Sequence, residues 1–372
     1  MKDCRCLVAV FLLAWGVTAL RAQATEDNLV PLHNLPEIND ANRNIIRAFV
    51  GKRVAAVTAD KSSAASPAVK ELIKECGGAD KAAAPGEAFK RAYVAACVEV
   101  IGAEFKNAEV VPATRLITVL NTFGSVEARP VLIEALADPR AGVRAAGAIG
   151  LRSLRDKLGA AGREAYDAVL AALKEAGKRE KARDTLKEIY AALNYADVPS
   201  APDARANAAA VLELLDERAK QYAAGQVQAL GADDAGLRLA AALAKTLGDD
   251  ERKRLTVAAG TMLKYALEQY TSGERKLSAV RDSTGNPQVV ELRNDMERLV
   301  LVGEQLLVAL LAPPAPVPAV ADGMRKADAT EMKNAWKRWV ELLQKAVGQD
   351  FSLVEAPESQ PAGPTTKAAD KE

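Results

Sequence analysis

Few side chains of this sequence are of a type that could carry out chemistry. The one histidine, His33, lies in an irregular segment that contains prolines. A single imidazole excludes histidine-based zinc clusters, HExxH sites and relays of several histidines. The sequence also contains no GxSxG elbow, Walker loop or CxxC pair. We therefore expect no catalytic residue, no metal site and no cofactor, and we predict that the protein is not an enzyme.

The cysteines leave two alternatives open. Cys4 and Cys6 lie in a predicted leader, so that only Cys76 and Cys97 belong to the body of the chain. In an oxidising compartment these two can form a disulfide, which would stabilise the fold by about 3 kcal/mol through the entropy of the unfolded chain. Alternatively, they are two thiols that pack as small apolar groups. The sequence does not set the Cα–Cα distance, which would decide between them.

Two acidic runs, Asp233-Asp234 and Asp249-Asp250-Glu251, stand where helices are expected to begin. A calcium site would need more oxygen ligands at loop spacing and a glycine at the turn. Negative charge is favoured at a helix N-terminus, where aspartate can accept hydrogen bonds from free backbone amides. We interpret both runs as capping residues.

The first 24 residues are typical of a secretory signal peptide. Lys2 and Arg5 precede the apolar stretch 7–20, and Ala22-Gln23-Ala24 supplies a small-x-small cleavage pattern. The apolar stretch is shorter than the roughly 20 residues that a spanning helix needs, which disfavours an uncleaved anchor. We predict a secreted or periplasmic protein with no membrane span in the mature chain.

The net charge of the chain disfavours one class of partner, and its composition indicates that it folds. The 372 residues include 50 Lys+Arg and 49 Asp+Glu, for a formal net charge of +1. Nucleic-acid binding needs a basic excess that releases counterions, so we expect no nucleic-acid partner. With 49% hydrophobic and 27% charged residues, the composition is that of a chain that folds.

The elements that would position any site are helices. Apolar residues recur at helical spacing through most of the chain, separated by short breaks, and no sustained two-residue alternation indicates strands. We predict an all-α protein. The expected parts are a signal peptide at 1–24, an irregular and helical N-terminal segment at 25–67, a helical array at 68–311, a Pro-rich linker at 312–326, a C-terminal capping helix at 327–348 and a disordered tail at 355–372.

One stretch, residues 131–154, has a recognisable pattern of two helices. Asp138 and Pro139 precede the second helix, where aspartate can cap free amides and proline suits the first turn. From Val143 onward the second helix presents a continuous apolar stripe with small residues in it, which lets helix axes approach closely.

This stretch resembles the HEAT-repeat family of antiparallel helix pairs. The resemblance is carried by Leu136, Asp138, Pro139, Val143, Arg144, Ala146, Ala148 and Leu151. A second copy is visible at 232–247, where Leu237-Arg238 takes the place of Val143-Arg144. The two arginines are 94 residues apart, about two units of a family whose period is roughly 40–47 residues. Tetratricopeptide repeats rank behind, because their aromatic signature is missing.

The resemblance implies a right-handed α-solenoid of stacked antiparallel helix pairs, a fold that presents extended surfaces to proteins or peptides. It also implies that Arg144 and Arg238 serve the stacking between units. The expected function is that of an exported, non-enzymatic interaction scaffold. The alternatives are a structural protein of the cell envelope and, less favoured, a HEAT-like lyase that acts on a bound small molecule.

Two surfaces are candidates for partner binding. Arg152, Arg155 and Lys157 form a predicted basic patch on the second helix of the 131–154 unit, together with an outward-facing Arg140. On the C-terminal helix, Trp336 and Trp339 share one face. We expect that helix to pack back as a cap, and the alternative is an exposed helix that docks a partner.

Overall fold

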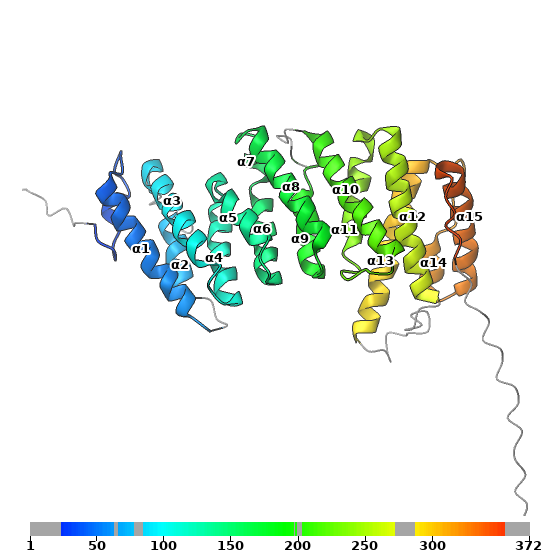
Figure 1. Ribbon diagram of the computed structural model, residues 1–372, viewed down its shortest axis with the longest axis horizontal. Coiled ribbons are helices and arrows are strands. Elements are labelled where there is room, and N and C mark those ends of the chain that lie inside the picture. The colour runs from blue at the N-terminus through cyan, green and yellow to red at the C-terminus, as the bar shows by residue number, and fades with distance from the viewer. Residues whose placement is uncertain are drawn as a thin grey trace, which may run out of the picture. The chain divides into compact units, whose positions relative to one another are not determined.

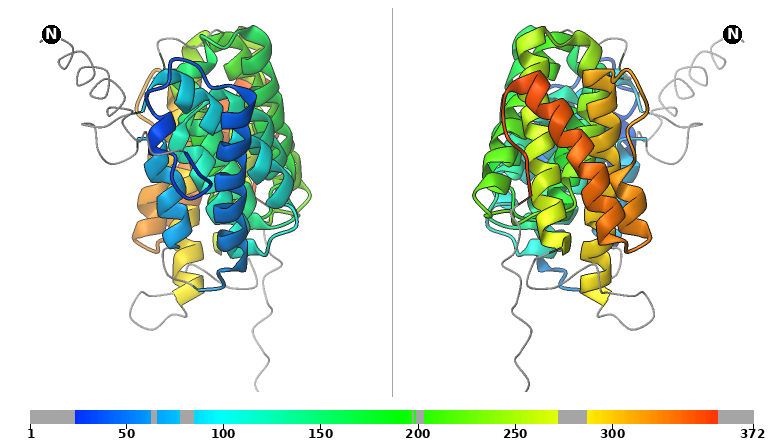
Figure 2. Two further views of the ribbon diagram at one scale, coloured as in Figure 1. Left: turned by 90° about the vertical axis from the view of Figure 1, so that its left-hand side faces the viewer. Right: turned by 90° about the vertical axis from the view of Figure 1, so that its right-hand side faces the viewer.

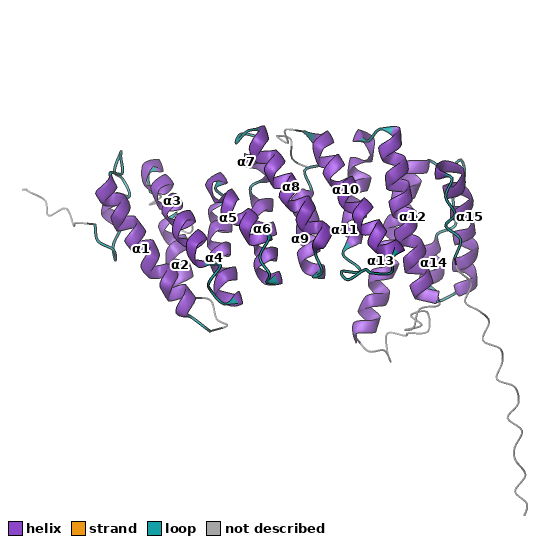
Figure 3. Cartoon of the chain, in the orientation of Figure 1, coloured by secondary structure: helices purple, strands orange, loops and turns teal. Residues whose placement is uncertain are grey.

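The computed structural model describes residues 24–62, 66–77, 85–196, 198, 203–271 and 287–353. The predicted signal peptide, apart from Ala24, and the predicted disordered tail lie outside these residues. Within them the regular secondary structure is helical, and the one β-type contact is an isolated bridge between Thr25 and Asn28 (Figure 3). The all-α prediction is confirmed.

The chain divides into two compact units, Met1–Ala161 and Gly162–Glu372, at a boundary inside the region that we expected to be one array. The helices of the first unit are η1 Val30–Leu32, α1 Asp40–Ala59, α2 Pro67–Glu75, α3 Glu87–Glu104, α4 Val110–Phe123, η3 Val126–Ala128, α5 Arg129–Leu136, α6 Ala141–Ser153 and α7 Arg155–Leu158. Those of the second unit are α8 Arg163–Arg179, α9 Arg183–Leu193, α10 Ala204–Ala223, α11 Asp233–Leu243, η4 Ala244–Thr246, α12 Asp249–Thr271, α13 Pro287–Leu311, α14 Val320–Arg325 and α15 Ala329–Val347.

In the first unit, helices pack both on the next helix and on the next but one. The helix α1 contacts α2 and α3, α2 contacts α4, and α4 contacts α3 and α6 (Figure 1). The short helix η3 joins α3 to α5, which packs on α6. Alternate helices therefore form two layers, one of α1, α3 and α5 and one of α2, α4 and α6, because each amphipathic helix must bury its apolar stripe against several neighbours.

The second unit repeats this arrangement. The helix α10 contacts α8, α11 and α12, and α11 contacts α9 and α13. The layers are α8, α10 and α12 on one side and α9, α11 and α13 on the other. At the end of the unit α14 contacts α13, and α15 contacts α12 and α14 (Figure 2, right).

The C-terminal helix α15 is packed rather than free. Trp336 and Trp339 are each 1% exposed. The indole Nε1 of Trp339 donates to Glu304 Oε1 at 2.9 Å, and that of Trp336 donates to the carbonyl of Phe351 at 3.0 Å. The expectation of a helix that packs back on the fold is confirmed, and the alternative of an exposed tryptophan face is wrong.

The Pro-rich linker is shorter than we predicted. Residues 312–319 lie outside the helices, but α14 begins at Val320. Glu304 of α13 causes this start, since its carboxylate accepts the backbone N–H groups of Val320 and Ala321 at 2.7 and 3.1 Å. A side chain from another helix thus satisfies amides that the sequence of α14 leaves without a local cap.

The turn between α5 and α6 differs from our expectation. Arg140, not Asp138, is the N-cap of α6, and Pro139 precedes the helix. The Asp138 carboxylate accepts the backbone N–H of Arg140 at 2.8 Å and also its guanidinium. The same guanidinium donates from Nη2 to the carbonyl of Phe105 at 3.1 Å and from Nη1 to that of Ala108. Arg140 therefore ties this turn to the preceding α3–α4 turn. The prediction that it faces outward is wrong.

Candidate functional site

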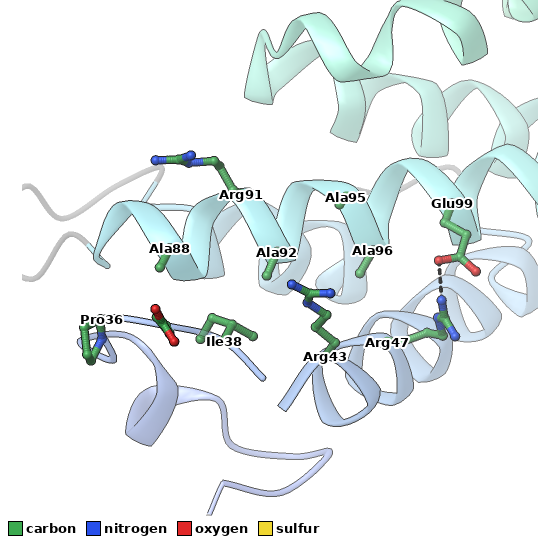
Figure 4. A pocket seen from close by; sticks show the side chains of 11 residues that line it. Pro36, Ile38, Arg43, Arg47, Ala88, Arg91, Ala92, Ala95, Ala96 and Glu99 are labelled. Carbon is green, nitrogen blue, oxygen red and sulfur yellow. Dashed lines mark hydrogen bonds and ion pairs between the residues drawn. The ribbon is translucent and has the colours of Figure 1, made fainter. Parts of the chain in front are cut away.

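A groove in the first unit places two arginines, Arg43 and Arg47, opposite a row of alanines (Figure 4). It lies between α1, α3 and the segment 36–38, and its volume is about 610 Å³. We call it the arginine groove. Its lining residues are Pro36, Glu37, Ile38, Arg43, Arg47, Ala88, Arg91, Ala92, Ala95, Ala96 and Glu99 (Figure 4).

The groove exists because one face of α3 carries only small side chains. Its four alanines follow helical spacing and line the space beside α1, with Ala88, Ala92 and Ala96 directed into it (Figure 4). On an adjacent face of the same helix, Phe89 and Tyr93 are fully buried in the core of the unit. The large side chains therefore hold α3 in place while the alanines leave the space open.

The charged groups of the groove are mostly exposed and loosely paired. Arg43 lies 3.4 Å from Asp40, and Arg47 lies 2.7 Å from Glu99. Arg91 also lines the groove, but its side chain is directed away from Arg43 and Arg47 (Figure 4), and its charge helps to lower the pKa of Glu127. Guanidinium groups stay protonated at any physiological pH, so they supply fixed positive charge and hydrogen-bond donors rather than proton transfer. This chemistry suits the binding of carboxylates.

His33 anchors the segment that forms one wall of the groove. Its Nε2 lies 3.0 Å from Glu75 Oε2 at the end of α2, and its carbonyl accepts the Gly86 N–H at 2.7 Å. Its ring contacts that of Phe89, with centroids 4.6 Å apart. The sole histidine thus joins the segment before α1 to α2 and α3, a structural role.

The predicted basic patch is divided between two helices. The helix α6 ends at Ser153, so that Arg152 lies on α6 while Arg155 and Lys157 lie on α7. Lys157 Nζ donates to the carbonyl of Gly124, the left-handed C-cap of α4, and is thus tied to that turn. Arg152 and Arg155 are half-buried. The expectation that all three share one helix is wrong.

The two copies of the repeat pattern use their arginines differently. Val143 and Leu237 are both fully buried, as the resemblance implies. Arg144 donates to the carbonyls of Asp138 and Pro139 at 2.9 and 2.7 Å, within its own turn. Arg238 is instead a surface side chain, 68% exposed and 3.6 Å from Asp234. A structural role is therefore shown for Arg144 but not for Arg238.

Arg238 lines a smaller pocket of the second unit. The pocket lies between α9 and α11, has a volume of about 390 Å³ and is lined by Lys187, Tyr190, Ala191, Asn194, Asp234, Ala235, Arg238, Leu239 and Ala242. Two of its charges, on Arg238 and Asp234, face each other. The third charged side chain that lines the pocket is Lys187.

Beside this pocket lies a buried polar network that the sequence did not reveal. Asp233 is fully buried and accepts hydrogen bonds from Arg218 Nη2 at 2.8 Å, Tyr190 Oη at 2.7 Å and Tyr222 Oη at 2.9 Å. Burial raises the pKa of both tyrosines well above their ordinary value. Every member is enclosed, so the network holds α9, α10 and α11 together.

The two acidic runs have different roles at the starts of their helices. Asp233 heads α11 but does not cap it, and the prediction of a cap is wrong there. Asp249 begins α12, and Glu251 accepts the Gly248 N–H at 2.8 Å. The second run therefore does serve the start of a helix.

Both body cysteines are free thiols in the structure. Cys97 is buried on the core face of α3, and Cys76 is half-buried at the C-cap of α2. Burial raises the pKa of both thiols, which keeps them protonated and poorly nucleophilic. Of the two alternatives for Cys76 and Cys97, the structure shows packed thiols rather than a disulfide.

No protein-family model matches the sequence, and no curated protein matches it. Among the described residues no cluster of His, Cys, Asp and Glu has the arrangement of a metal site. None of the described helices is both long and apolar enough to cross a membrane.

Proposed function

We propose that this chain is an exported, non-enzymatic scaffold for protein–protein interactions, built from HEAT-like helix pairs that stack as a right-handed α-solenoid. The observation that carries the proposal is the packing within each unit. Successive helices pair, and alternate helices stack into two layers. Stacked pairs of this kind bury a continuous core and leave long rows of helices at the surface, which suits the binding of another protein.

The exposed apolar side chains support a binding surface on one layer of the first unit. Among the described residues, Val110 and Val111 of α4 and Ile149 of α6 are large apolar side chains that are at least 37% exposed. The two helices pack against each other, so these residues lie on neighbouring elements. Between them α4 carries threonines whose hydroxyls are already bonded to carbonyls one turn earlier, so that the outer face is largely apolar.

The second unit offers a related surface. Leu301 and Val308 of α13 are 42% and 47% exposed and lie seven residues apart on that helix. The layer α9, α11 and α13 therefore also presents apolar side chains to solvent. Apolar groups that stay exposed in a folded chain are a common feature of interaction surfaces.

A pull-down with matched variants tests the proposal. We expect Val111→Glu/Ile149→Glu to lose partners that the unaltered chain captures from an envelope fraction, since a carboxylate opposes apolar contact. Val30→Glu is the control, because Val30 is 63% exposed on η1, outside these helices. Equal capture by all three proteins would count against this surface. Self-association at a fixed stoichiometry, with no other partner, would favour a structural envelope protein instead.

Export is tested separately. The mass of the protein recovered outside the cytoplasm should correspond to a chain that begins at Thr25. Retention of the first 24 residues in that fraction would contradict cleavage.

A further inference from the structure

We propose that residues 354–366 of the chain lie along the outer face of α15 and cover a row of lysines there. Two observations carry this inference. The exposed side of α15 has an excess of positive charge, and the described part of the chain ends beside that helix just before an acidic sequence. The contact lies within one chain and does not depend on the scaffold function proposed above.

The charge excess is confined to lysines. The exposed charged residues of α15 are Lys333, Lys337, Arg338, Glu341 and Lys345. Glu341 is the one carboxylate among them, and it lies 3.4 Å from Arg338. Within the residues that the structure describes, none of the three lysines has an ion pair. We call these three residues the lysine face.

The other carboxylates of α14 and α15 are already engaged. Asp322 pairs with Arg325, and Glu331 lies 2.7 Å from Lys326. Asp328 caps α15, where its carboxylate accepts two backbone N–H groups at 2.9 Å. The lysine face therefore needs its counter-charge from outside these two helices.

The chain turns back along α15 after that helix ends (Figure 2, right). Gly348, in the left-handed conformation, is its C-cap. Phe351 is 1% exposed, and its carbonyl accepts Trp336 Nε1 at 3.0 Å. A Cβ added to Gly260 of α12 would stand 2.9 Å from the Phe351 ring, so this residue is held between α12 and α15. The described chain thus ends, at Leu353, within two residues of a contact with Trp336.

The sequence that follows is acidic. Glu355 and Glu358 are the only charged residues in 354–366. They follow Leu353 by two and five residues, so an extended chain can carry them roughly 7 and 17 Å from it. A helix with its side chains is about 10–12 Å across, so both carboxylates can reach the outer side of α15.

The two nearest lysines lie at the right level of α15. Lys337 follows Trp336 directly, and Lys333 lies one turn before Lys337. Exposed ion pairs are individually weak, but a tethered segment is present at its site at an effective concentration of about millimolar. The acidic segment therefore keeps the lysine face from other anions until salt or a stronger competitor displaces it.

Zero-length coupling tests the placement in the full chain. A carbodiimide joins a carboxylate to an amine that is in contact with it, and mass spectrometry of the digested monomer identifies the pairs. We expect Glu355 and Glu358 to couple to Lys333 and Lys337, less so as salt is raised. Coupling spread evenly over other exposed lysines, such as Lys70 of α2, or found only between separate chains, would overturn the proposal.

A competition experiment tests the covering of the face. The probe is a labelled peptide of about six glutamates, roughly 20 Å long when extended, followed by fluorescence anisotropy. Glu355→Gln/Glu358→Gln should bind it about two- to tenfold more tightly than the unaltered chain, since two ion pairs no longer compete. Glu104→Gln/Glu164→Gln, which removes exposed carboxylates from α3 and α8, should bind as the unaltered chain does. Equal gains in the two variants would contradict the proposal, because only net charge would then matter.

A further pair of variants locates the peptide. In the Glu355→Gln/Glu358→Gln background, Lys333→Gln/Lys337→Gln should abolish the gain in affinity, whereas Lys70→Gln/Lys245→Gln should preserve it. Tight binding of the peptide to the unaltered chain, with no gain in the glutamine variant, would show that the lysine face is open to a separate acidic partner. That result would also reject residues 354–366 as its cover.

Discussion

Single buried charges determine how several helices of the second unit meet. Arg218 is 1% exposed, and its guanidinium is neutralised by the fully buried Asp233. Its Nη1 donates to Gln221 Oε1 at 2.6 Å, so the guanidinium has a second acceptor in addition to the carboxylate. An enclosed charge of this kind is tolerated only while its partner is present.

Removal of one partner should therefore be costly. We expect Asp233→Ala to lower the free energy of unfolding by about 3–5 kcal/mol, because it leaves a buried guanidinium and two tyrosine hydroxyls without their acceptor. Urea denaturation followed by circular dichroism measures the change. Asp322→Ala, which removes the exposed partner of Arg325, should cost less than about 1 kcal/mol. Similar losses of unfolding free energy in the two variants would show that burial does not increase the contribution of the Asp233 network to stability.

Glu304 should make stability depend on pH. Burial raises the pKa of this carboxyl above its ordinary value of 4.5, although the two backbone amides and Trp339 oppose the rise. The folded chain therefore holds the proton more tightly than the unfolded chain, and this contribution to stability is present below pH 4.5 and is lost as pH rises through the folded pKa.

The comparison with Glu304→Gln isolates this effect. Glutamine does not titrate, and its oxygen still accepts a hydrogen bond. We expect the stability of the unaltered chain relative to Glu304→Gln to decline as the pH is raised from about 4 towards neutrality. Denaturation of both proteins at a series of pH values measures this difference in stability. A difference that stays constant with pH, or that grows as pH rises, would contradict the direction of the pKa shift.

At the scale of elements, packing depends on where small residues lie. A Cβ added to Gly147 of α6 would stand 2.8 Å from the backbone nitrogen of Leu136, so α5 and α6 approach closely there. A Cβ added to Gly51 of α1 would meet nothing within 4 Å. The same substitution should therefore have opposite effects at the two positions.

Gly147→Ala should destabilise the first unit by about 1–3 kcal/mol, since the backbone of α5 must move. Gly51→Ala should stabilise it by about 0.5–1 kcal/mol, because alanine has the better helix propensity and costs less backbone entropy. Thermal melts of the two variants measure both changes. The same sign in both would contradict the close approach of α5 and α6.

The sequence predicts the helices well because each one carries its own signal. The capping helix expected at 327–348 is α15, which agrees with these bounds to within about two residues. Within α3, Phe89, Tyr93 and Cys97 recur every four residues, and all three are fully buried. Such features depend on residues within a few turns of one another.

Features that join distant segments were not predictable. The alanine spacing of α3 could have indicated an open face, but nothing local shows that Arg43 and Arg47 would face it across the α1–α3 contact. Asp233 has the pattern of a capping residue, and only the packing of α9 and α10 shows that it neutralises Arg218. The role of Arg140 likewise depends on a neighbouring turn rather than on its own helix.

At the scale of the whole molecule, each unit has its own buried core. Leu116 of α4 and Leu263 of α12 are both fully buried, one in each unit. Units with separate cores can unfold separately, so we expect two transitions in calorimetry.

Each core variant should then affect one transition only. Leu116→Ala and Leu263→Ala should each lower the stability of their own unit by about 2–5 kcal/mol. Differential scanning calorimetry distinguishes the units by which transition moves. If both variants shift a single common transition by similar amounts, the units unfold as one.

The carboxylate of Glu304 bears on the order in which parts of the chain can fold. Its hydrogen-bond donors lie 16, 17 and 35 residues later in the sequence, at Val320, Ala321 and Trp339. While the chain leaves a ribosome, this group must stay hydrated until those residues have emerged. The C-terminal end of the second unit is therefore completed last, and a chain truncated before Trp339 leaves that group without its indole donor.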